Sequence, residues 1–262
     1  MQKKYNFITG LPRSGTTLLT AILNQNPRFT ASISGPLARF ARSVIQESSS
    51  QGGYRLQCDE TMRKRIIRGI FDSYYADSSE EVVFDTNRGW SLLSPLVKDL
   101  YPSSKIIVCV RSVSWILDSF ETLVRKNPYA FTSMYSTDEN TNVYSRCTAL
   151  MRSDRPVGFA YEGLKQLLSS REMATGSVFI LEYDRLAKRP ESTMEALYKF
   201  LEEPHFEHDF NNVETSYDEF DADVNLKGLH TTRSKVEFIE RQFILPPDIV
   251  QQYANSEIWR GR

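Results

Sequence analysis

The sequence predicts an α/β fold, a P-loop-like parallel sheet flanked by helices, in a single domain over residues 1–262. Short apolar runs alternate along the chain with segments of helical periodicity, which is the pattern of βαβ units. The run Ile106–Val110 is apolar without interruption, as is typical of a parallel strand covered on both faces. A glycine-rich turn follows the first run, and a chain of this length needs no disulfide or metal to build its core.

Four apolar runs are the predicted strands of this sheet. They occupy Tyr5–Thr9, Glu81–Phe84, Lys105–Val110 and Ser177–Leu181. Their length of four to six residues suits strands rather than buried helices. The helical segments between them supply the crossovers that parallel strands require.

Helical patterns fill the intervals between the strands. The predicted helices are Thr16–Asn26, Thr61–Tyr75, Trp90–Leu100, Val113–Arg125, Val157–Leu168 and Pro190–Leu201. Proline suits the first turn of a helix, which supports the start of the last of these. Ser48–Gly53 is a predicted surface loop, and Pro204–Arg233 is predicted to be loop-rich and acidic.

The composition argues against some classes of binding partner. The formal net charge is −1 and the pI is about 6.4, which argues against a general nucleic-acid or anionic-membrane binder. No apolar run approaches the roughly 18 residues of a membrane span. The three cysteines are widely spaced and odd in number, so a cytoplasmic protein with free thiols is expected. The sequence does not determine the oligomeric state.

The first strand leads into the segment GLPRSGTT, residues 10–17. Its two glycines have the spacing of the P-loop, G-x-x-x-x-G-K-[ST], and Thr17 holds the hydroxyl position. Backbone N–H groups and a helix N-terminus therefore still face an anion, and Arg13 adds a planar fork of donors. Thr16 replaces the lysine that ATP and GTP enzymes use on their β- and γ-phosphates, so a shorter phosphate chain is expected.

The segment LPRSGTTLL, residues 11–19, resembles the 5′-phosphosulfate-binding loop of sulfotransferases. These enzymes use 3′-phosphoadenosine 5′-phosphosulfate (PAPS), and the PRSGTT wording is closest to their tyrosylprotein and bacterial branch. The resemblance implies a sulfotransferase-like fold, PAPS as co-substrate and no metal. The implied contacts to its phosphosulfate are Arg13, Ser14, Gly15, Thr16 and Thr17.

The third predicted strand ends at Arg111, and Ser119 follows about two helical turns later. This pair resembles the family's 3′-phosphate site, an arginine at a strand end and a serine on the next helix. Arg111 also lies where open α/β sheets bind ligands, beyond the carboxyl ends of the strands. A surface arginine and a helix-facing serine would be the alternative.

Two further segments resemble parts of the family more weakly. Tyr183 follows the fourth strand, where the family has a tyrosine beside the adenine; a core tyrosine is the alternative. Residues 228–235 take the place of the late loop that closes over the nucleotide. Within it, Arg233 and Lys235 are either phosphate contacts or part of an exposed basic turn.

The general base is not obvious from the sequence. Tyrosylprotein sulfotransferases carry a glutamate shortly after the first helix, but no carboxylate occurs here before Glu47. Asp85 ends the second strand and is either the base or a structural hydrogen-bonding residue. Arg88 is a candidate cation at the leaving phosphate. His230 is the next candidate base, because its ordinary pKa suits proton transfer, or else a loop histidine with its bonds satisfied.

The sequence therefore predicts a PAPS-dependent sulfotransferase whose acceptor is a hydroxyl on a small molecule or saccharide. The aromatic-bearing segment 127–144 is either part of the acceptor pocket or lid, or a loop anchored to the core. Two rivals remain: a P-loop nucleotide kinase, which would want the missing lysine, and a catalytically silent nucleotide-binding module. No residues are predicted to bind a metal.

Overall fold

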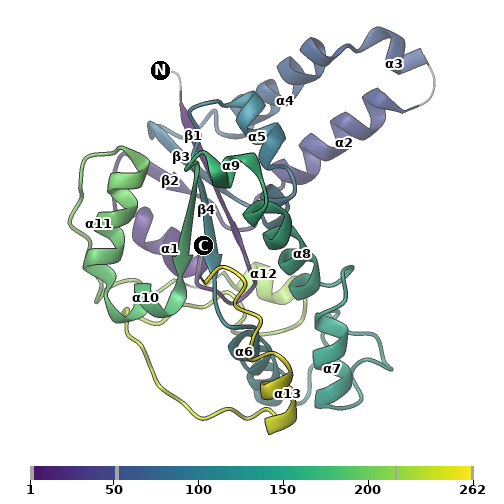
Figure 1. Cartoon of the computed structure of the whole chain (residues 1–262), viewed down its shortest axis with the longest axis vertical. Coiled ribbons are helices and arrows are strands. Elements are labelled where there is room, and N and C mark those ends of the chain that lie inside the picture. Colours follow the sequence, from purple (N-terminus) through teal and green to yellow (C-terminus); the bar gives the residue numbers. More distant parts are fainter. Residues whose placement is uncertain (1–2, 51–52, 216, 261–262) are drawn as a thin grey trace.

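The computed structural model describes residues 3–50, 53–215 and 217–260, and a parallel sheet lies at its centre (Figure 1). The strands are β1 (Lys4–Gly10), β2 (Phe29–Ala31), β3 (Val82–Thr86), β4 (Ile106–Val110) and β5 (Val178–Glu182). Their spatial order is β2-β3-β1-β4-β5, and every pairing is parallel. The carboxyl ends of β3 and β4 therefore flank the carboxyl end of β1.

The α/β prediction and its four strands are confirmed, with ends shifted by one or two residues. The sequence analysis did not foresee β2. This strand has three residues, too few for a periodic pattern, and pairs only with β3.

Both faces of the sheet are covered, which explains the uninterrupted apolar strands. Phe7 and Ile8 are neighbours on β1, yet they belong to separate buried clusters and neither is exposed. Side chains on a strand alternate between faces, so each cluster covers one face of the sheet. Apolar burial on two faces supplies the main driving force for this fold.

The first half of the chain contributes the helices that precede β4 and the 3₁₀ turn η1. These are α1 (Thr16–Leu23), α2 (Leu37–Ser49), α3 (Gly53–Gln57), α4 (Glu60–Tyr74), η1 (Arg88–Ser91) and α5 (Ser94–Leu100). The predicted helix Trp90–Leu100 is thus a 3₁₀ turn followed by a shorter α-helix. Ser48 and Ser49 end α2, so the first part of the predicted loop Ser48–Gly53 is helical; residues 51–52 lie outside the described residues.

The remaining helices follow β4. They are α6 (Val113–Lys126), α7 (Val143–Leu150), α8 (Pro156–Leu168), α9 (Arg171–Ala174), α10 (Tyr183–Lys188), α11 (Pro190–Leu201), α12 (Asp218–Asp223) and α13 (Pro247–Gln252). Within the described ranges, no helix combines the length and apolar character needed to cross a membrane.

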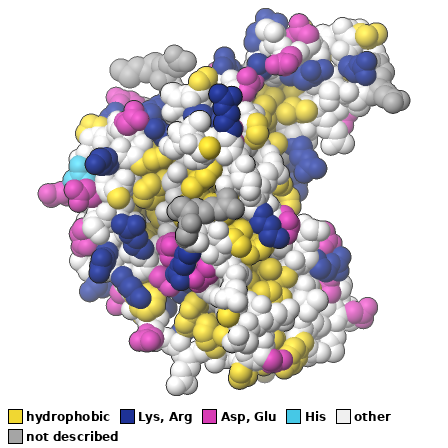
Figure 2. Space-filling model, in the orientation of Figure 1, with side chains coloured by type: hydrophobic (Ala, Val, Ile, Leu, Met, Phe, Trp, Pro, Cys, Tyr) yellow, Lys and Arg dark blue, Asp and Glu magenta, His cyan; other side chains and the backbone are white. Residues whose placement is uncertain are grey.

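The helices α2, α3 and α4 form an arm that projects from the body at the upper right of Figures 1 and 2. Only Ile67 and Phe71 of α4 are buried, although the helical pattern places four other apolar residues beside them. The exposed tip residues Tyr54 and Leu56 add to the apolar surface of the arm. Figure 2 shows a hollow between this arm and the lower right of the molecule.

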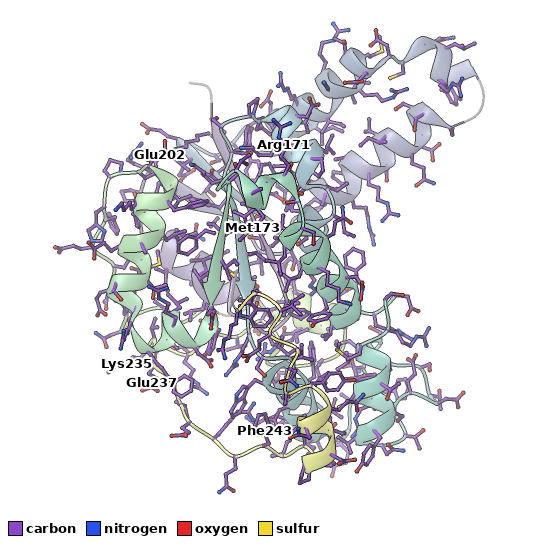
Figure 3. The ribbon with its side chains drawn as sticks, in the orientation of Figure 1. Arg171, Met173, Glu202, Lys235, Glu237 and Phe243 are labelled. Atoms are coloured by element: carbon purple, nitrogen blue, oxygen red, sulfur yellow. The ribbon has the colours of Figure 1, made fainter. Side chains whose placement is uncertain are left out.

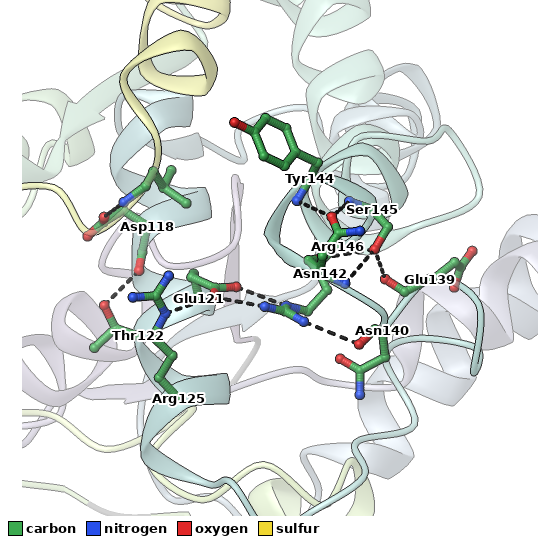
Figure 4. Close-up of polar contacts among 11 residues, drawn as sticks. Asp118, Glu121, Thr122, Arg125, Glu139, Asn140, Asn142, Tyr144, Ser145 and Arg146 are labelled. Atoms are coloured by element: carbon green, nitrogen blue, oxygen red, sulfur yellow. Dashed lines mark hydrogen bonds and ion pairs between the residues drawn. The ribbon is translucent and has the colours of Figure 1, made fainter.

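The aromatic-bearing segment 127–144 is tied to α6 by a buried carboxylate (Figure 4). Glu121 accepts hydrogen bonds of 2.9 Å from Arg125 and from both the Nε and Nη2 atoms of Arg146. Asn142 caps α7 by accepting from the backbone of Ser145. These contacts fix the end of the segment against the body.

Between α12 and α13 the chain forms a long loop through the lower left of Figure 1. Figure 3 shows Lys235 and Glu237 on the left part of this loop and Phe243 beside α13. The Phe243 ring stacks on Trp115 of α6, with ring centroids 4.1 Å apart. Asp118, which is fully buried, accepts a hydrogen bond of 2.7 Å from the backbone of Ile244. The late segment is thereby held over the carboxyl edge of the sheet.

Candidate functional site

A cleft of about 920 Å³ lies at the carboxyl edge of the sheet. Its walls come from the turn after β1, the ends of β3 and β4, the start of α10 and the late segment 220–241. This is the place where parallel α/β sheets bind ligands, because the loops that follow neighbouring strands converge there. Eleven predicted site residues line it: Arg13, Gly15, Thr16, Thr17, Arg88, Arg111, Ser119, Tyr183, His230, Arg233 and Lys235.

The turn after β1 depends on two glycines with positive φ. A Cβ on Gly10, whose φ is +136°, would lie 2.1 Å from the carbonyl oxygen of Cys109. A Cβ on Gly15, whose φ is +91°, would lie 2.7 Å from the Tyr183 ring. Both the backbone conformation and the close neighbours therefore require glycine. The turn delivers the chain to the N-terminus of α1, and Gly15, Thr16 and Thr17 line the cleft there.

Ser14 differs from the other members of the turn. Its hydroxyl is fully buried and lies 2.6 Å from the Leu11 carbonyl and 2.9 Å from the Cys109 carbonyl. The side chain does not line the cleft and instead ties the turn to β4. The Ser14 hydroxyl therefore shapes the turn, and the contact of Ser14 with the phosphosulfate stays a prediction.

The Arg13 side chain extends from the turn after β1 and forms hydrogen bonds with α6 and with the late loop. Its Nε donates to the Ser119 hydroxyl at 3.0 Å, and its Nη1 donates to the Leu229 carbonyl. Burial, followed by the charge of Arg111, lowers the pKa of Arg13 to about 10, so it stays charged at neutral pH. The predicted 5′- and 3′-phosphate residues and the late loop thus meet at one side chain.

Arg111 retains hydrogen-bonding capacity for a ligand. Its Nε lies 3.6 Å from the Asp184 carboxylate, too far for a hydrogen bond, and is buried without a partner among the described residues. The guanidinium lies over the Tyr183 ring, 4.2 Å from its centroid. Burial is the main cause that lowers the pKa of Arg111. An anion at this position would satisfy both its charge and its free donor.

Tyr183 lies between the turn after β1, residues 10–17, and Arg111. One edge of its ring contacts Gly15, and the cation of Arg111 stacks on its face. The side chain is half-buried and lines the cleft, so it is not a core residue. It holds Arg111 in place at the ligand-facing edge.

Basic side chains dominate the cleft. Nine line it, against the two acids Asp223 and Glu237. The nine are Arg13, Arg39, Arg88, Arg111, Lys126, Lys227, Arg233, Lys235 and Arg241. This surplus attracts a polyanionic ligand although the whole chain is close to neutral.

The sequence analysis did not select Arg39, Lys227 or Arg241 from this set. Arg241 lies 2.6 Å from Asp118 Oδ2 and stacks over Trp115, which places it beside Ser119 on α6. No motif marks these residues, because they come from the unforeseen α2 and from irregular late segments. Lys126 ends α6, where its charge also suits the helix dipole.

His230 lies in the late loop with its imidazole at the cleft. Its Nδ1 is 2.9 Å from Asp221 Oδ1. Burial is the largest influence and lowers the pKa of His230, while Asp221 raises it and Arg13 and Arg88 lower it. The same interactions show that the histidine lies within electrostatic reach of both arginines. A neutral histidine at pH 7 is the form able to accept a proton.

Asp85 lies beneath the cleft rather than in its lining, contrary to the role of base expected from its position at a strand end. It is fully buried, and its two carboxyl oxygens accept hydrogen bonds of 2.7 Å from Tyr75 and from the Trp90 indole. Gly35 covers it closely, since a Cβ there would lie 2.8 Å from Asp85 Oδ2. This geometry is that of a structural hydrogen-bonding residue.

Arg88 points into the cleft from the turn after β3. Arg88 is an exposed residue, and no carboxylate within the described ranges forms an ion pair with its side chain. Thr86 and Asn87 line the cleft beside it. An unpaired cation next to neutral hydrogen-bonding groups suits a site where negative charge is bound or develops.

Comparisons with known proteins show the family of this chain. Residues 7–208 match the sulfotransferase family. The chain is 24% identical over 206 residues to a Caenorhabditis briggsae protein described as "Putative protein-tyrosine sulfotransferase", covering 75% of this chain and 64% of that protein. The chain thus spans under two thirds of this curated relative.

Two solved structures are similar to this chain. A sulfotransferase from Alicyclobacillus acidocaldarius superposes with a TM-score of 0.50 at 18% identity, over 85% of this chain and 91% of that one. The sulfotransferase domain from the curacin biosynthetic pathway gives a TM-score of 0.49 at 17% identity, over 79% and 76% of the two chains.

Proposed function

Because this chain belongs to the sulfotransferase family, we propose that it transfers a sulfuryl group from PAPS to a hydroxyl acceptor. One observation carries the proposal: the phosphate turn, the strand-end Arg111 and the late loop meet in one strongly basic cleft. Arg13 joins all three through its contacts with Ser119 and Leu229. A donor with phosphates at both the 5′ and 3′ positions requires such a paired anion site.

We propose that the turn after β1 binds the 5′-phosphosulfate and that Arg111 with Ser119 binds the 3′-phosphate. The amides before α1 are aimed at the first group, and Thr16 and Thr17 add neutral donors. The Nε of Arg111 has no hydrogen-bond partner among the described residues, which supports its proposed contact with the 3′-phosphate. Arg233 and Lys235 are proposed to close over the nucleotide from the late loop.

His230 is the general base in this proposal. The acceptor oxygen forms a bond to sulfur as the bond from sulfur to the 5′-phosphate oxygen breaks, and the acceptor proton passes to His230 Nε2. Arg13 and Arg88 lie near the imidazole and offset the charge on the sulfonate and the departing phosphate. Asp85 lacks both exposure to the cleft and a free carboxyl oxygen facing it.

The acceptor is proposed to be a hydroxyl on a small molecule or saccharide. Ser34 and Thr86 line the cleft near Arg88 and offer neutral hydrogen-bonding groups suited to a polyol. From segment 127–144, Met134 lines the cleft, whereas Tyr129 is exposed and Tyr135 is buried. This segment therefore contributes one wall residue to the proposed acceptor pocket.

A nucleotide titration tests the proposal. The desulfated product, 3′,5′-bisphosphoadenosine, is expected to raise Tm in the absence of Mg²⁺, since a ligand that binds only the folded state stabilises it. ATP with Mg²⁺ is expected to raise Tm less. Equal or greater stabilisation by Mg-ATP would favour the nucleotide kinase.

Transfer of labelled sulfate from PAPS to a panel of alcohols and saccharides separates an enzyme from a silent binding module. Product formation that depends on His230 supports the proposed chemistry. Binding of the bisphosphate without transfer to any acceptor would favour the silent module.

A further inference from the structure

The carboxylate of Asp221 organises the loop that carries His230. Asp221 belongs to α12 and is buried. Its Oδ2 accepts hydrogen bonds from the backbone of Gly228 at 2.6 Å and of Leu229 at 3.1 Å. Its Oδ1 accepts from the backbone of His230 at 2.9 Å. Three successive amides thus converge on one carboxylate, a satisfied arrangement for a buried charge.

The same carboxylate reaches the imidazole. Asp221 Oδ1 lies 2.9 Å from His230 Nδ1, so the neutral ring carries its proton on Nδ1 and donates it to the carboxylate. Nε2 is then left as a proton acceptor. The Phe220 ring packs 5.7 Å from the imidazole centroid and restricts its rotation. The charged groups that act on the ring are Asp221, Arg13 and Arg88.

The loop that Asp221 organises also contacts the phosphate turn. The carbonyl of Leu229 accepts a hydrogen bond from Arg13. The residues on either side of Leu229, Gly228 and His230, donate their backbone N–H groups to Asp221. Gly228 has a φ of +89°, which suits glycine in such a tight turn. One carboxylate therefore sets the position of the turn, of the Arg13 contact and of the imidazole.

We propose that Asp221 is a positioning residue that holds the His230 base in its Nδ1–H tautomer and fixes its orientation relative to the turn at residues 228–230. This inference rests on the proposed function for its catalytic meaning. Asp221 stabilises the imidazolium that forms when the acceptor proton arrives, because its negative charge lies beside the ring. It touches neither donor nor acceptor and acts through His230.

Nuclear magnetic resonance tests the positioning without requiring turnover. The chain has three histidines, so a His230→Gln variant assigns the His230 signals. In the wild-type protein, nitrogen-15 spectra are expected to show the neutral ring protonated at Nδ1. The Nε2–H tautomer would overturn the proposal, and this measurement needs no change at Asp221.

The Asp221→Asn variant tests the electrostatic contribution. Removing the negative charge is expected to lower the pKa of His230 by about one unit, at the low end of the shift caused by a neighbouring opposite charge. Asp223→Asn is the matched control, since Asp223 is an acid of the same helix that lines the cleft. An equal shift in both variants, or none in either, would contradict the pairing.

A double-mutant cycle separates positioning from general structural support. In the wild-type background, Asp221→Asn is expected to lower kcat roughly 10- to 100-fold, less than the roughly 10²- to 10⁴-fold contribution of a general base because His230 itself remains. In the His230→Gln background the same change is expected to cost little, because the group it acts through is gone. Equal losses in both backgrounds would overturn the positioning role. A wild-type protein without transfer activity would refute the proposed function, while the tautomer and pKa would still test Asp221.

Discussion

Replacing Asp85 by asparagine should remove a pH-dependent cost of folding. Burial raises the pKa of Asp85 from 3.8 to about 6, against the opposing hydrogen bonds from Tyr75 and Trp90. Because the folded-state pKa lies above the unfolded value, the Asp85 carboxyl contributes most to the free energy of unfolding below about pH 4, where it is protonated in both states. This contribution is lost as pH rises through about 6. The shift of about two units corresponds to about 3 kcal/mol, at 1.36 kcal/mol per unit.

Urea unfolding at intervals between pH 4 and 8 measures this effect. The free energy of unfolding of wild type relative to Asp85→Asn is expected to fall by about 2.5 kcal/mol across that range, because the rest of the change lies below pH 4 and other titrating groups are common to both proteins. A difference that stays constant with pH would refute the reasoning, since it would mean that Asp85 titrates alike in the folded and unfolded states.

The turnover rate of Asp85→Asn tests whether Asp85, rather than His230, is the general base. With His230 as the base, Asp85→Asn is expected to keep donor affinity and most of kcat in protein that remains folded. A fall of roughly 100-fold or more in kcat, with donor affinity and melting curve intact, would return the role of base to Asp85.

Three further substitutions probe the turn, the 3′-phosphate site and the α6 network. Gly15→Ala should lower stability by about 1–3 kcal/mol and weaken nucleotide binding, because its backbone is left-handed and a tyrosine ring contacts it; calorimetry showing unchanged Tm and affinity would contradict this. Arg111→Ala should weaken PAPS binding by about 1.5–3 kcal/mol but spare a nucleotide without the 3′-phosphate, and equal losses would argue against the assignment. Glu121→Ala should cost about 3 kcal/mol of unfolding free energy because Arg146 loses its buried partner, whereas the exposed Arg125→Ala should cost under about 1 kcal/mol.

The sequence predicted the sheet because its central strands are buried on both faces and read as apolar runs. Helix Pro190–Leu201 was predicted to the residue, since proline fixes its start and the apolar spacing marks its length. The short β2 was missed because three residues carry no period. Several helices were also missed, among them α2, which buries Leu37, Ala38 and Ala41 on one face, and α7.

Some residues of the candidate site could be predicted from a local sequence motif, and others could not. The glycine spacing and Arg13 are local features of one turn, and the resemblance to the phosphosulfate loop rests on them. The basic lining from Arg39 and Arg241 depends on segments with no motif. No local pattern could show that they face the same cleft.

By itself, the sequence determined the turn after β1, because the backbone geometry of such a turn depends on residues adjacent in the chain. Tertiary structure alone decided the chemistry assigned to Asp85, Asp221 and His230. Asp85 ends a strand at the right edge of the sheet, but Tyr75 and Trp90 enclose it from elsewhere in the fold. Asp221 and His230 become partners only when α12 and the late loop meet, because a carboxylate's role depends on which donors and how much water surround it.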